Sequence, residues 1–312
     1  MPVRWKPAMR FAAVAAGLYT LAMAIMAHLP FMGKPLVYRT GDYYTWPGGD
    51  TWLRFREFDP RQRYDAVIIG SSHAYRGYDP YVFAQRGHKV FNLGSSAQTP
   101  LNTYWLVQEF LDSTNTPLLI FDVYMGSFRN CGLESTADLC QNQPSDAAAA
   151  GMAFDLRDLR GLNLLAVRCL TDHRQPFYTD TSYQGLGFVP TPDSIKAAAG
   201  PPPAAAVSLD PRQRHFFEAI VALCRERGIA LVVSSHFERF DRRDLAHQPV
   251  ASYIGQALAP TGVRYLDFTN APGIDDRNWF ADHSHLNTAG ARIFTTQLVD
   301  SLEQLGYLPH KP

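Results

Sequence analysis

Two short polar segments of this 312-residue chain contain residue types that can carry out nucleophilic chemistry. Residues 70–73 (Gly-Ser-Ser-His) supply serine hydroxyls, and residues 282–285 (Asp-His-Ser-His) supply an aspartate and a histidine three positions apart. A serine hydroxyl is a poor nucleophile until a base takes its proton, and a histidine base needs a carboxylate to fix its tautomer. Because Asp282 and His285 can meet on one turn, the two segments together predict nucleophilic catalysis by an activated serine.

The elements around these segments predict a parallel β-sheet that brings them to one edge. The apolar run 65–70 is typical of a buried strand that ends at Gly-Ser-Ser, and 89–93 is typical of a second strand that ends at Gly94. Further strands are expected at 118–123, 230–234 and 263–268, with helices at 79–87, 100–111, 216–227, 252–258 and 288–305. Alternating strands and helices indicate β-α-β units, in which ligands bind at the carboxyl ends of the strands.

The order of these segments resembles the SGNH/GDSL hydrolase superfamily. In that family a nucleophilic serine follows the first strand, a glycine after the second strand donates an oxyanion-hole amide, and a C-terminal Asp-x-x-His completes a triad. The resemblance covers residues 65–305 apart from an insertion, and it implies a flavodoxin-like α/β fold, a three-layer sandwich with a central parallel sheet. It implies that Ser72 is the nucleophile, that Asp282 and His285 complete the triad, and that the amides of Ser72 and Gly94 form the oxyanion hole.

Two blocks depart from the family pattern. Ser71 stands where the family has the aspartate of Gly-Asp-Ser. Residues 122–126 (Asp-Val-Tyr-Met-Gly) replace the third block, Gly-x-Asn-Asp, whose asparagine completes the oxyanion hole, so the third donor is unassigned. With an apolar N-terminal segment, these departures look most like the membrane-anchored extracytoplasmic branch that includes the D-alanyl-transfer protein of teichoic-acid modification and the alginate O-acetyltransferases.

The resemblance implies an extracytoplasmic serine esterase or O-acyltransferase without a cofactor. Its substrate would be an acyl group of a cell-envelope polysaccharide or glycolipid, or another acylated lipid, and its partner a membrane-bound O-acyltransferase. The alternative is a catalytically weak or inactive SGNH-fold scaffold, or a glycan-binding partner of such an acyltransferase, with the altered third block as its sign.

Three further histidines lie near the predicted site. His73 follows the candidate nucleophile and His236 ends the fourth strand, so each is a candidate for substrate contact or for packing at the edge of the site. His283 is expected to face solvent. Asp282, His283, His285 and His236 could instead ligate zinc, but the chain has no second compact ligand pair, and that interpretation leaves the serine turn unexplained.

The first forty residues contain an apolar segment that is long enough to span a bilayer. Residues 11–32 carry no charge, and about 20 apolar residues are needed to cross the hydrocarbon. We expect a single-pass signal anchor, with residues 1–10 in the cytoplasm because basic residues precede the segment, and with the domain in the periplasm. A cleaved signal peptide, with Ala-Met-Ala at 22–24 as its cleavage site, and a buried N-terminal helix are the alternatives.

The charge balance of the chain excludes one class of protein. The 29 Lys and Arg balance the 29 Asp and Glu, so the basic excess of a nucleic-acid-binding protein is missing.

The rest of the chain is expected to form one domain. We expect a connecting segment at 33–60 and one α/β domain at 61–312, with an insertion at about 125–207 that ends in the flexible Ala/Pro tract 197–206. Cys131 and Cys140 could close a small disulfide loop, and Cys224 is expected to be a buried free thiol.

Overall fold

The computed structural model describes residues 5–40, 47–195, 208–239 and 247–310. At its centre is a parallel sheet of five strands in the order β4-β3-β5-β6-β7. The strands are β3 (Ala66–Ile69), β4 (Val90–Asn92), β5 (Leu118–Asp122), β6 (Ala230–Ser235) and β7 (Arg264–Asp267). Counted along the chain this is the order 2-1-3-4-5 of flavodoxin-like folds, so the predicted fold class is confirmed.

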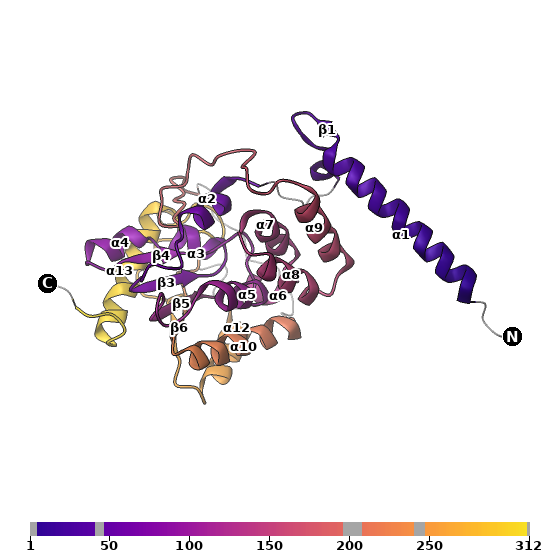
Figure 1. Ribbon diagram of the computed structural model, residues 1–312. Helices are drawn as coiled ribbons and strands as arrows, with labels where there is room; N and C mark the ends of the chain where they lie inside the picture. The colour runs from indigo at the N-terminus through magenta and orange to yellow at the C-terminus, as the bar shows by residue number, and fades with distance from the viewer. Residues whose placement is uncertain (1–4, 41–46, 196–207, 240–246, 311–312) are drawn as a thin grey trace.

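Helices cover both faces of the sheet (Figure 1). One face packs against α2 (Gly49–Glu57), α5 (Pro100–Phe110), α10 (Pro211–Arg227) and α12 (Gln248–Leu258). The other face packs against α3 (Ser72–Gly77), α4 (Pro80–Gln85) and α13 (Thr288–Gln304). Successive side chains of a strand point to opposite faces, so Val67 and Ile69 enter the first layer and Ala66 and Ile68 the second. Each strand and helix expected from the sequence is present with shifted ends, whereas α2 and the short helix α3 on the sheet were not expected.

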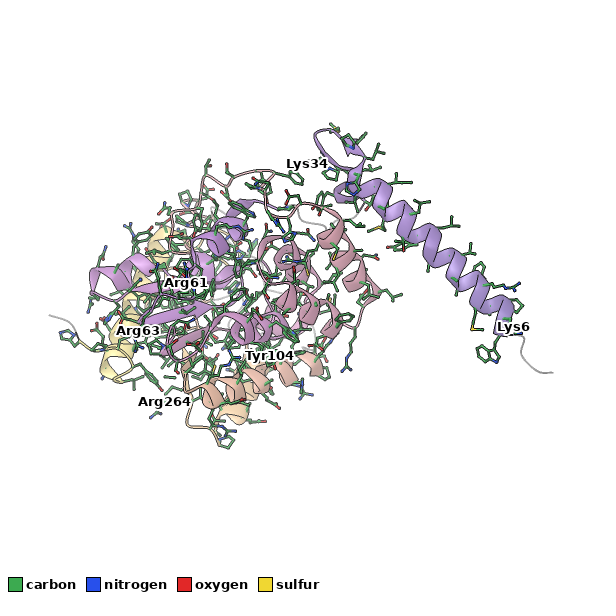
Figure 2. The ribbon with its side chains drawn as sticks, in the orientation of Figure 1. Lys6, Lys34, Arg61, Arg63, Tyr104 and Arg264 are labelled. Atoms are coloured by element: carbon green, nitrogen blue, oxygen red, sulfur yellow. The ribbon has the colours of Figure 1, made fainter. Side chains whose placement is uncertain are left out.

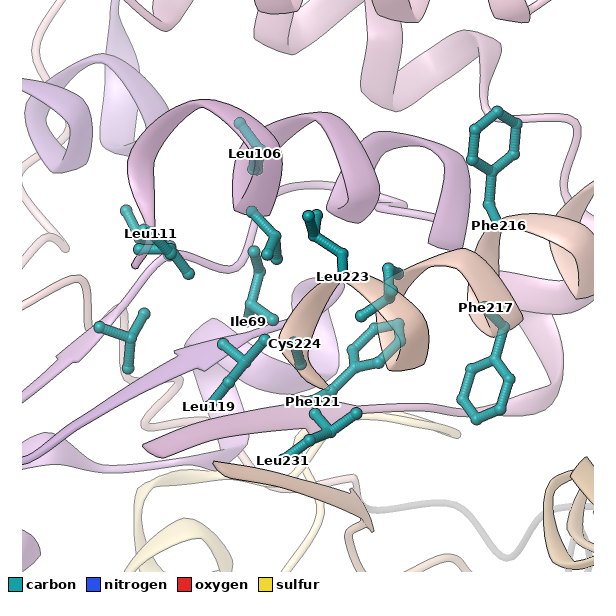
Figure 3. Packing of buried hydrophobic residues seen from close by; sticks show 14 of the residues in the cluster. Ile69, Leu106, Leu111, Leu119, Phe121, Phe216, Phe217, Leu223, Cys224 and Leu231 are labelled. Atoms are coloured by element: carbon teal, nitrogen blue, oxygen red, sulfur yellow. The ribbon is translucent and has the colours of Figure 1, made fainter. Parts of the chain in front are cut away.

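The larger of the two cores lies between the sheet and the helices α5 and α10 (Figure 3). Leu119 and Phe121 of β5 meet Leu106 of α5 and Phe217 of α10 there, and all four side chains are buried. Burying one Leu or Phe side chain contributes roughly 1.5–3 kcal/mol, so this layer anchors β5 firmly. Cys224 is buried in the same layer as a free thiol, as predicted.

The insertion after β5 is helical and has a small core of its own. It comprises α6 (Met125–Arg129), α7 (Leu133–Asn142), α8 (Asp146–Asp155) and α9 (Leu159–Leu170). Leu133, Cys140 and Leu164 share its apolar cluster. The predicted disulfide is wrong, because Cys140 turns into this cluster from α7 while Cys131 is exposed, and both thiols are free. The Ala/Pro tract 197–206 lies outside the described residues.

The N-terminal segment forms the helix α1 (Trp5–His28), which extends away from the domain (Figure 1). Among the described residues it is the one helix long and apolar enough to cross a membrane. Only Met23 and Ala27 of α1 are buried, and the signal anchor, the cleaved signal peptide and the buried N-terminal helix all stay predictions. A hairpin of β1 (Pro30–Phe31) and β2 (Lys34–Pro35) and the 3-10 helix η1 (Leu36–Arg39) follow, and then α2 packs against the sheet from within the expected connecting segment.

Gly70 is required where β3 turns into α3. Its φ of +155° is a conformation that side-chain-bearing residues rarely adopt, and a Cβ there would lie 2.7 Å from the Cβ of Asp122. We expect Gly70→Ala to lower the free energy of unfolding by at least roughly 1–3 kcal/mol, measured by denaturant titration of the full chain in detergent. Gly255→Ala is the matched control, because a Cβ at this helical position has no neighbour within 4 Å. Equal stability of the two variants would contradict the expectation.

Candidate active site

The three residues of the predicted triad form one chain of hydrogen bonds. Ser72 Oγ lies 2.8 Å from His285 Nε2, across a separation of 213 residues in the sequence. His285 Nδ1 lies 2.8 Å from Asp282 Oδ2. With the proton of the neutral imidazole on Nδ1, the ring donates to the carboxylate and Nε2 accepts from the serine hydroxyl. The arrangement can therefore move a proton from Ser72 to His285 while Asp282 holds the ring in position.

The turn after β3 places Ser72 at the carboxyl edge of the sheet. Ser71 caps α3, because its hydroxyl accepts a hydrogen bond from the amide of His73 at 3.1 Å. Ser72 is the first residue of that helix and is partly exposed. The far end of α3 is tied to α13, since Thr295 Oγ1 accepts from the amide of Asp79 at 2.9 Å. The helix that follows the serine is thus held against the helix that follows the histidine.

The loop before α13 positions Asp282 and His285, the other two residues of the predicted triad. Asp282 Oδ1 accepts hydrogen bonds from the amides of Ser284 at 2.8 Å and His285 at 2.9 Å, which leaves Oδ2 to face the imidazole. Partial burial alone would raise the pKa of Asp282, but the hydrogen bonds from the His285 ring and the two amides outweigh it and hold this pKa well below its usual range. Asn287 caps α13, because its side-chain oxygen accepts a hydrogen bond from the amide of Gly290 at 3.0 Å.

The predicted oxyanion donors lie on either side of the same turn. The amide of Ser72 is in the first turn of α3, where amides have no partner within the helix. Gly94 lies close to the turn, because a Cβ on it would come within 3.0 Å of the Ser71 carbonyl oxygen. Its amide donates to Asn92 Oδ1 at 3.0 Å, so an oxyanion would share or displace that bond. The oxyanion role of Ser72 and Gly94 stays a prediction.

His73 and His236 form an aromatic stack with a residue of the altered third block. The ring of His73 lies between Tyr124, at a centroid distance of 3.9 Å, and His236, at 4.4 Å. Burial lowers the pKa of His236 to about 4, and His236 Nδ1 donates to the carbonyl oxygen of Phe237, so this ring is neutral. Only 3% of His73 and 2% of His236 is exposed, so both rings are buried. The predicted contacts of His73 and His236 with substrate stay predictions.

A small pocket lies next to the two segments that carry Ser72 and His285, since it is lined by the residue after the serine and the residue before the histidine. It has a volume of about 120 Å³ and is lined by His73, Tyr124, Met125, Gly126, Glu238, Arg239, His283 and Ser284. His283 is exposed, as predicted, and nevertheless contributes to the rim. In the sequence, Tyr124 and Met125 stood out only as part of the altered block 122–126 after the third strand, and neither was given a role in the site.

The zinc interpretation finds no ligand set in the described part of the chain. No group of three or more His, Cys, Asp or Glu side chains is placed there to hold a metal ion. Both ring nitrogens of His285 are engaged, one by Ser72 and one by Asp282. His236 stacks on His73 with its Nδ1 bound to a backbone carbonyl, so it does not join them.

Asp122 is a buried carboxyl group beneath the nucleophile turn, and the sequence analysis assigned it no role. Tyr78 Oη donates to Asp122 Oδ1 at 2.9 Å, and the amide of Ser71 also hydrogen-bonds to this carboxyl. Complete burial raises the pKa of Asp122 to about 7 despite these bonds. An aspartate at the end of an otherwise apolar strand, five residues long, was the signal that could have identified it.

Comparison with known proteins gives no match in sequence. No protein-family model matches the chain, and no curated protein matches it. Among solved structures the chain is similar to a lipase/acylhydrolase from Enterococcus faecalis, with 12% identity and a TM-score of 0.41 over 79% of this chain and 99% of the other. It is also similar to an acetylxylan esterase from Geobacillus stearothermophilus, with 9% identity and a TM-score of 0.43 over 82% and 99%.

A GDSL-like lipase from Bacteroides thetaiotaomicron is similar at 10% identity, with a TM-score of 0.40 over 77% of this chain and 88% of the other. Because identities and TM-scores are this low, the assignment of function depends on the geometry of the site.

The raised pKa of Asp122 predicts a dependence of stability on pH. Between about pH 4 and pH 7 the folded chain holds this proton and the unfolded chain does not, so the free energy of unfolding falls as the pH rises. We expect this contribution to be on the order of 2–4 kcal/mol and to level off above pH 7. Denaturant titrations of the full chain and of Asp122→Asn across this range measure it.

Asp122→Asn serves as the reference for this measurement, because an amide keeps an acceptor for Tyr78 and cannot titrate. Asp138, another buried carboxyl with a raised pKa, contributes equally to both chains and cancels in the difference. Parallel curves for the two chains would show that Asp122 does not carry the dependence.

Proposed function

We propose that the chain is a membrane-anchored serine esterase or O-acyltransferase whose catalytic domain lies outside the cytoplasm. Ser72 is the nucleophile, His285 is the general base and then the general acid, and Asp282 orients His285. The observation that carries the proposal is the continuous hydrogen-bonded chain from Ser72 Oγ through the imidazole to the Asp282 carboxylate. A polar turn with a merely structural role would not require a histidine and a carboxylate in this order at 2.8 Å each.

The reaction has two half-reactions. Ser72 Oγ attacks an acyl carbonyl while its proton moves to His285 Nε2, and the amides of Ser72 and Gly94 stabilise the oxyanion. Collapse of the tetrahedral intermediate breaks the ester bond, and His285 returns the proton to the leaving alcohol oxygen. In the second half the hydroxyl of water or of an acceptor gives its proton to His285 and attacks the acyl-serine. The bond between the acyl carbon and Ser72 Oγ then breaks, and His285 returns the proton to Ser72 Oγ. Water as acceptor makes the enzyme an esterase, and a sugar hydroxyl makes it a transferase.

The substrate class follows from the resemblance and from the anchor. A cell-envelope polysaccharide or glycolipid, or another acylated lipid, is the proposed acyl donor or acceptor, and a membrane-bound O-acyltransferase is the proposed partner. The length and exposure of α1 support a place at the membrane. The domain would then act on material at the membrane surface.

A second candidate function is a scaffold or glycan-binding subunit with little catalysis. The engagement of the Gly94 amide by Asn92 Oδ1 favours it, because each missing oxyanion donor costs about 3 kcal/mol of transition-state stabilisation. Residues 122–126 also lack the third-block asparagine, so a further oxyanion donor is missing and transition-state stabilisation would be lower again.

Covalent labelling separates these two functions. We expect the full chain in detergent to react with a fluorophosphonate probe, Ser72→Ala to show no labelling, and His285→Gln to react at least about 1000-fold more slowly, because Ser72 loses its base. In-gel fluorescence measures the reaction. Ser71→Ala is the matched control, since it removes a neighbouring hydroxyl that caps α3 and costs about 1 kcal/mol of stability while leaving the nucleophile. A folded wild-type chain that is not labelled would favour the scaffold.

The small pocket next to Ser72 in the chain predicts a preference for short acyl groups. Its volume is only about 120 Å³, and His73 and Met125 line it. We expect kcat/KM to be higher for p-nitrophenyl acetate than for the octanoate. Met125→Ala should raise the octanoate-to-acetate ratio by enlarging the pocket, and an unchanged ratio would place the acyl group elsewhere.

A further inference from the structure

The helix that carries Ser72 presents one charged side chain at the surface. Ser72 and Arg76 are the two residues of α3 that are not buried. The buried residues of this helix are His73, Ala74, Tyr75 and Gly77. Because Ser72 and Arg76 are four positions apart, they lie on the same face of α3, with their Cβ atoms about 5–6 Å from each other. A molecule that places an ester bond at Ser72 therefore comes within reach of Arg76.

The positive charge of Arg76 is not balanced by a carboxylate. In the described part of the chain Arg76 forms no ion pair, and its Nε atom is buried without a hydrogen-bond partner. Its guanidinium lies 5.6 Å from the ring centroid of Tyr75 and interacts with the hydroxyl of that residue. Burial raises the pKa of Tyr75, so the phenol is neutral and cannot balance the charge. A buried polar atom without a partner calls for an explanation, and a bound ligand would supply one.

A second arginine at the same tyrosine is satisfied within the protein. Arg54 of α2 lies with its guanidinium 4.8 Å from the ring centroid of Tyr75. Its side chain is fully buried, pairs with Asp50 at 2.9 Å and donates to the carbonyl oxygen of Gly187 at 3.2 Å. Arg54 therefore has a structural role, with its charge compensated by Asp50. Of these two guanidinium groups, Arg76 is the one that is both accessible from Ser72 and without a carboxylate among the described residues.

Arg76 lies outside the pocket that is proposed for the acyl group. That pocket is lined by His73, by residues that follow β5 and β6, and by the loop before α13, and Arg76 does not line it. An anion held by Arg76 would therefore belong to the alcohol part of the ester, or to the acceptor alcohol that takes its place. The planar fork of a guanidinium matches the paired oxygens of a carboxylate or a phosphate.

We propose that Arg76 is a specificity-determining residue, which binds a carboxylate or a phosphate on the alcohol part of the ester that Ser72 cleaves. The proposal rests on the acyl transfer proposed above, and it adds the charge of the substrate to that function. The alcohol that leaves or accepts the acyl group is then anionic, and neutral alcohols are poorer substrates. Binding of the anion gives the buried Nε atom of Arg76 the acceptor that the described residues do not provide.

Paired aryl acetates test the proposal with the full chain in detergent. The ester para-acetoxybenzoate carries a carboxylate on its phenol, para-acetoxyphenyl phosphate carries a phosphate, and methyl para-acetoxybenzoate is neutral. Release of the phenol is measured from the first turnover onward, because it reports acylation of Ser72 whichever acceptor follows. The quantity compared between variants is the ratio of the second-order rate constant for an anionic ester to that for the neutral ester. Differences in intrinsic ester reactivity and in the amount of active protein cancel in this comparison.

Arg264→Gln is the matched control for Arg76→Gln. Arg264 is an exposed arginine at the amino end of β7, at the opposite edge of the sheet from Ser72 (Figure 2). We expect the ratio to fall roughly tenfold or more in Arg76→Gln, because a charge-assisted hydrogen bond to the anion is lost. The ratio should recover in part in Arg76→Lys, which keeps the charge without the planar fork, and should stay at the wild-type value in Arg264→Gln.

A second measurement needs no variant. The wild-type ratio should fall as the ionic strength rises from about 0.01 M to about 1 M, because salt screens the attraction between Arg76 and the anion. This result decides the question if Arg76→Gln is not labelled by the fluorophosphonate probe and has therefore lost its fold.

The outcomes separate this proposal from the proposed function. A preference for either anion that depends on Arg76 supports the proposal, and the larger ratio identifies the carboxylate or the phosphate as the group bound. An equal ratio in Arg76→Gln and the wild type, or no phenol release from any of the esters by a labelled chain, overturns this proposal and leaves the activated serine in place. A wild-type chain that is neither labelled nor releases phenol overturns the proposed function, and this proposal with it.

Discussion

The strands β3, β4 and β5 are buried along their whole length, and this constraint organises the rest of the molecule. A parallel sheet that is buried on both faces needs a helix in each crossover, and helices must lie above and below it. The carboxyl ends of all its strands then meet at one edge. Chemistry collects at that edge because the chain leaves every strand there, so side chains from distant segments meet without any long excursion of the backbone.

The bond between Ser72 and His285 depends on how α13 packs. The histidine lies in the loop before α13, and α13 is held on the sheet by buried side chains such as Phe294 and Leu298. The amide of Asp79, just after α3, donates to Thr295 of α13. Packing far from Ser72 thus sets the distance of 2.8 Å between its hydroxyl and the imidazole of His285.

Asp122 connects the altered third block to the nucleophile turn. The close approach of Gly70 to Asp122 and the hydrogen bond from Tyr78 fix the end of β5 against the end of β3. A carboxyl in this position is costly to ionise, so it favours the folded state most when it is protonated. The next residue but one, Tyr124, stacks on His73 and closes one side of the pocket. A block that departs from the family pattern therefore still contributes both support and shape to the site.

The sequence alone determined the sheet and most of its helices, and it singled out Ser72, Asp282 and His285, which the fold brings into one chain of hydrogen bonds. Strand and helix periodicity, Gly228 as a helix stop and the Asp-x-x-His spacing are local signals, and a parallel sheet leaves little freedom in where strand ends lie. The sequence did not predict contacts between distant segments. These include the stack of His73 on Tyr124 and His236, and the packing of Cys140 as a free thiol in the insertion core.

The sequence also did not predict the packing of α9 on α1, or the hydrogen bond from the amide of Gly94 to Asn92 Oδ1. Such contacts depend on which face of a helix or strand packs against which neighbouring element. The residue types determine which bonds a side chain can form, whereas only the tertiary structure determines which partner it contacts.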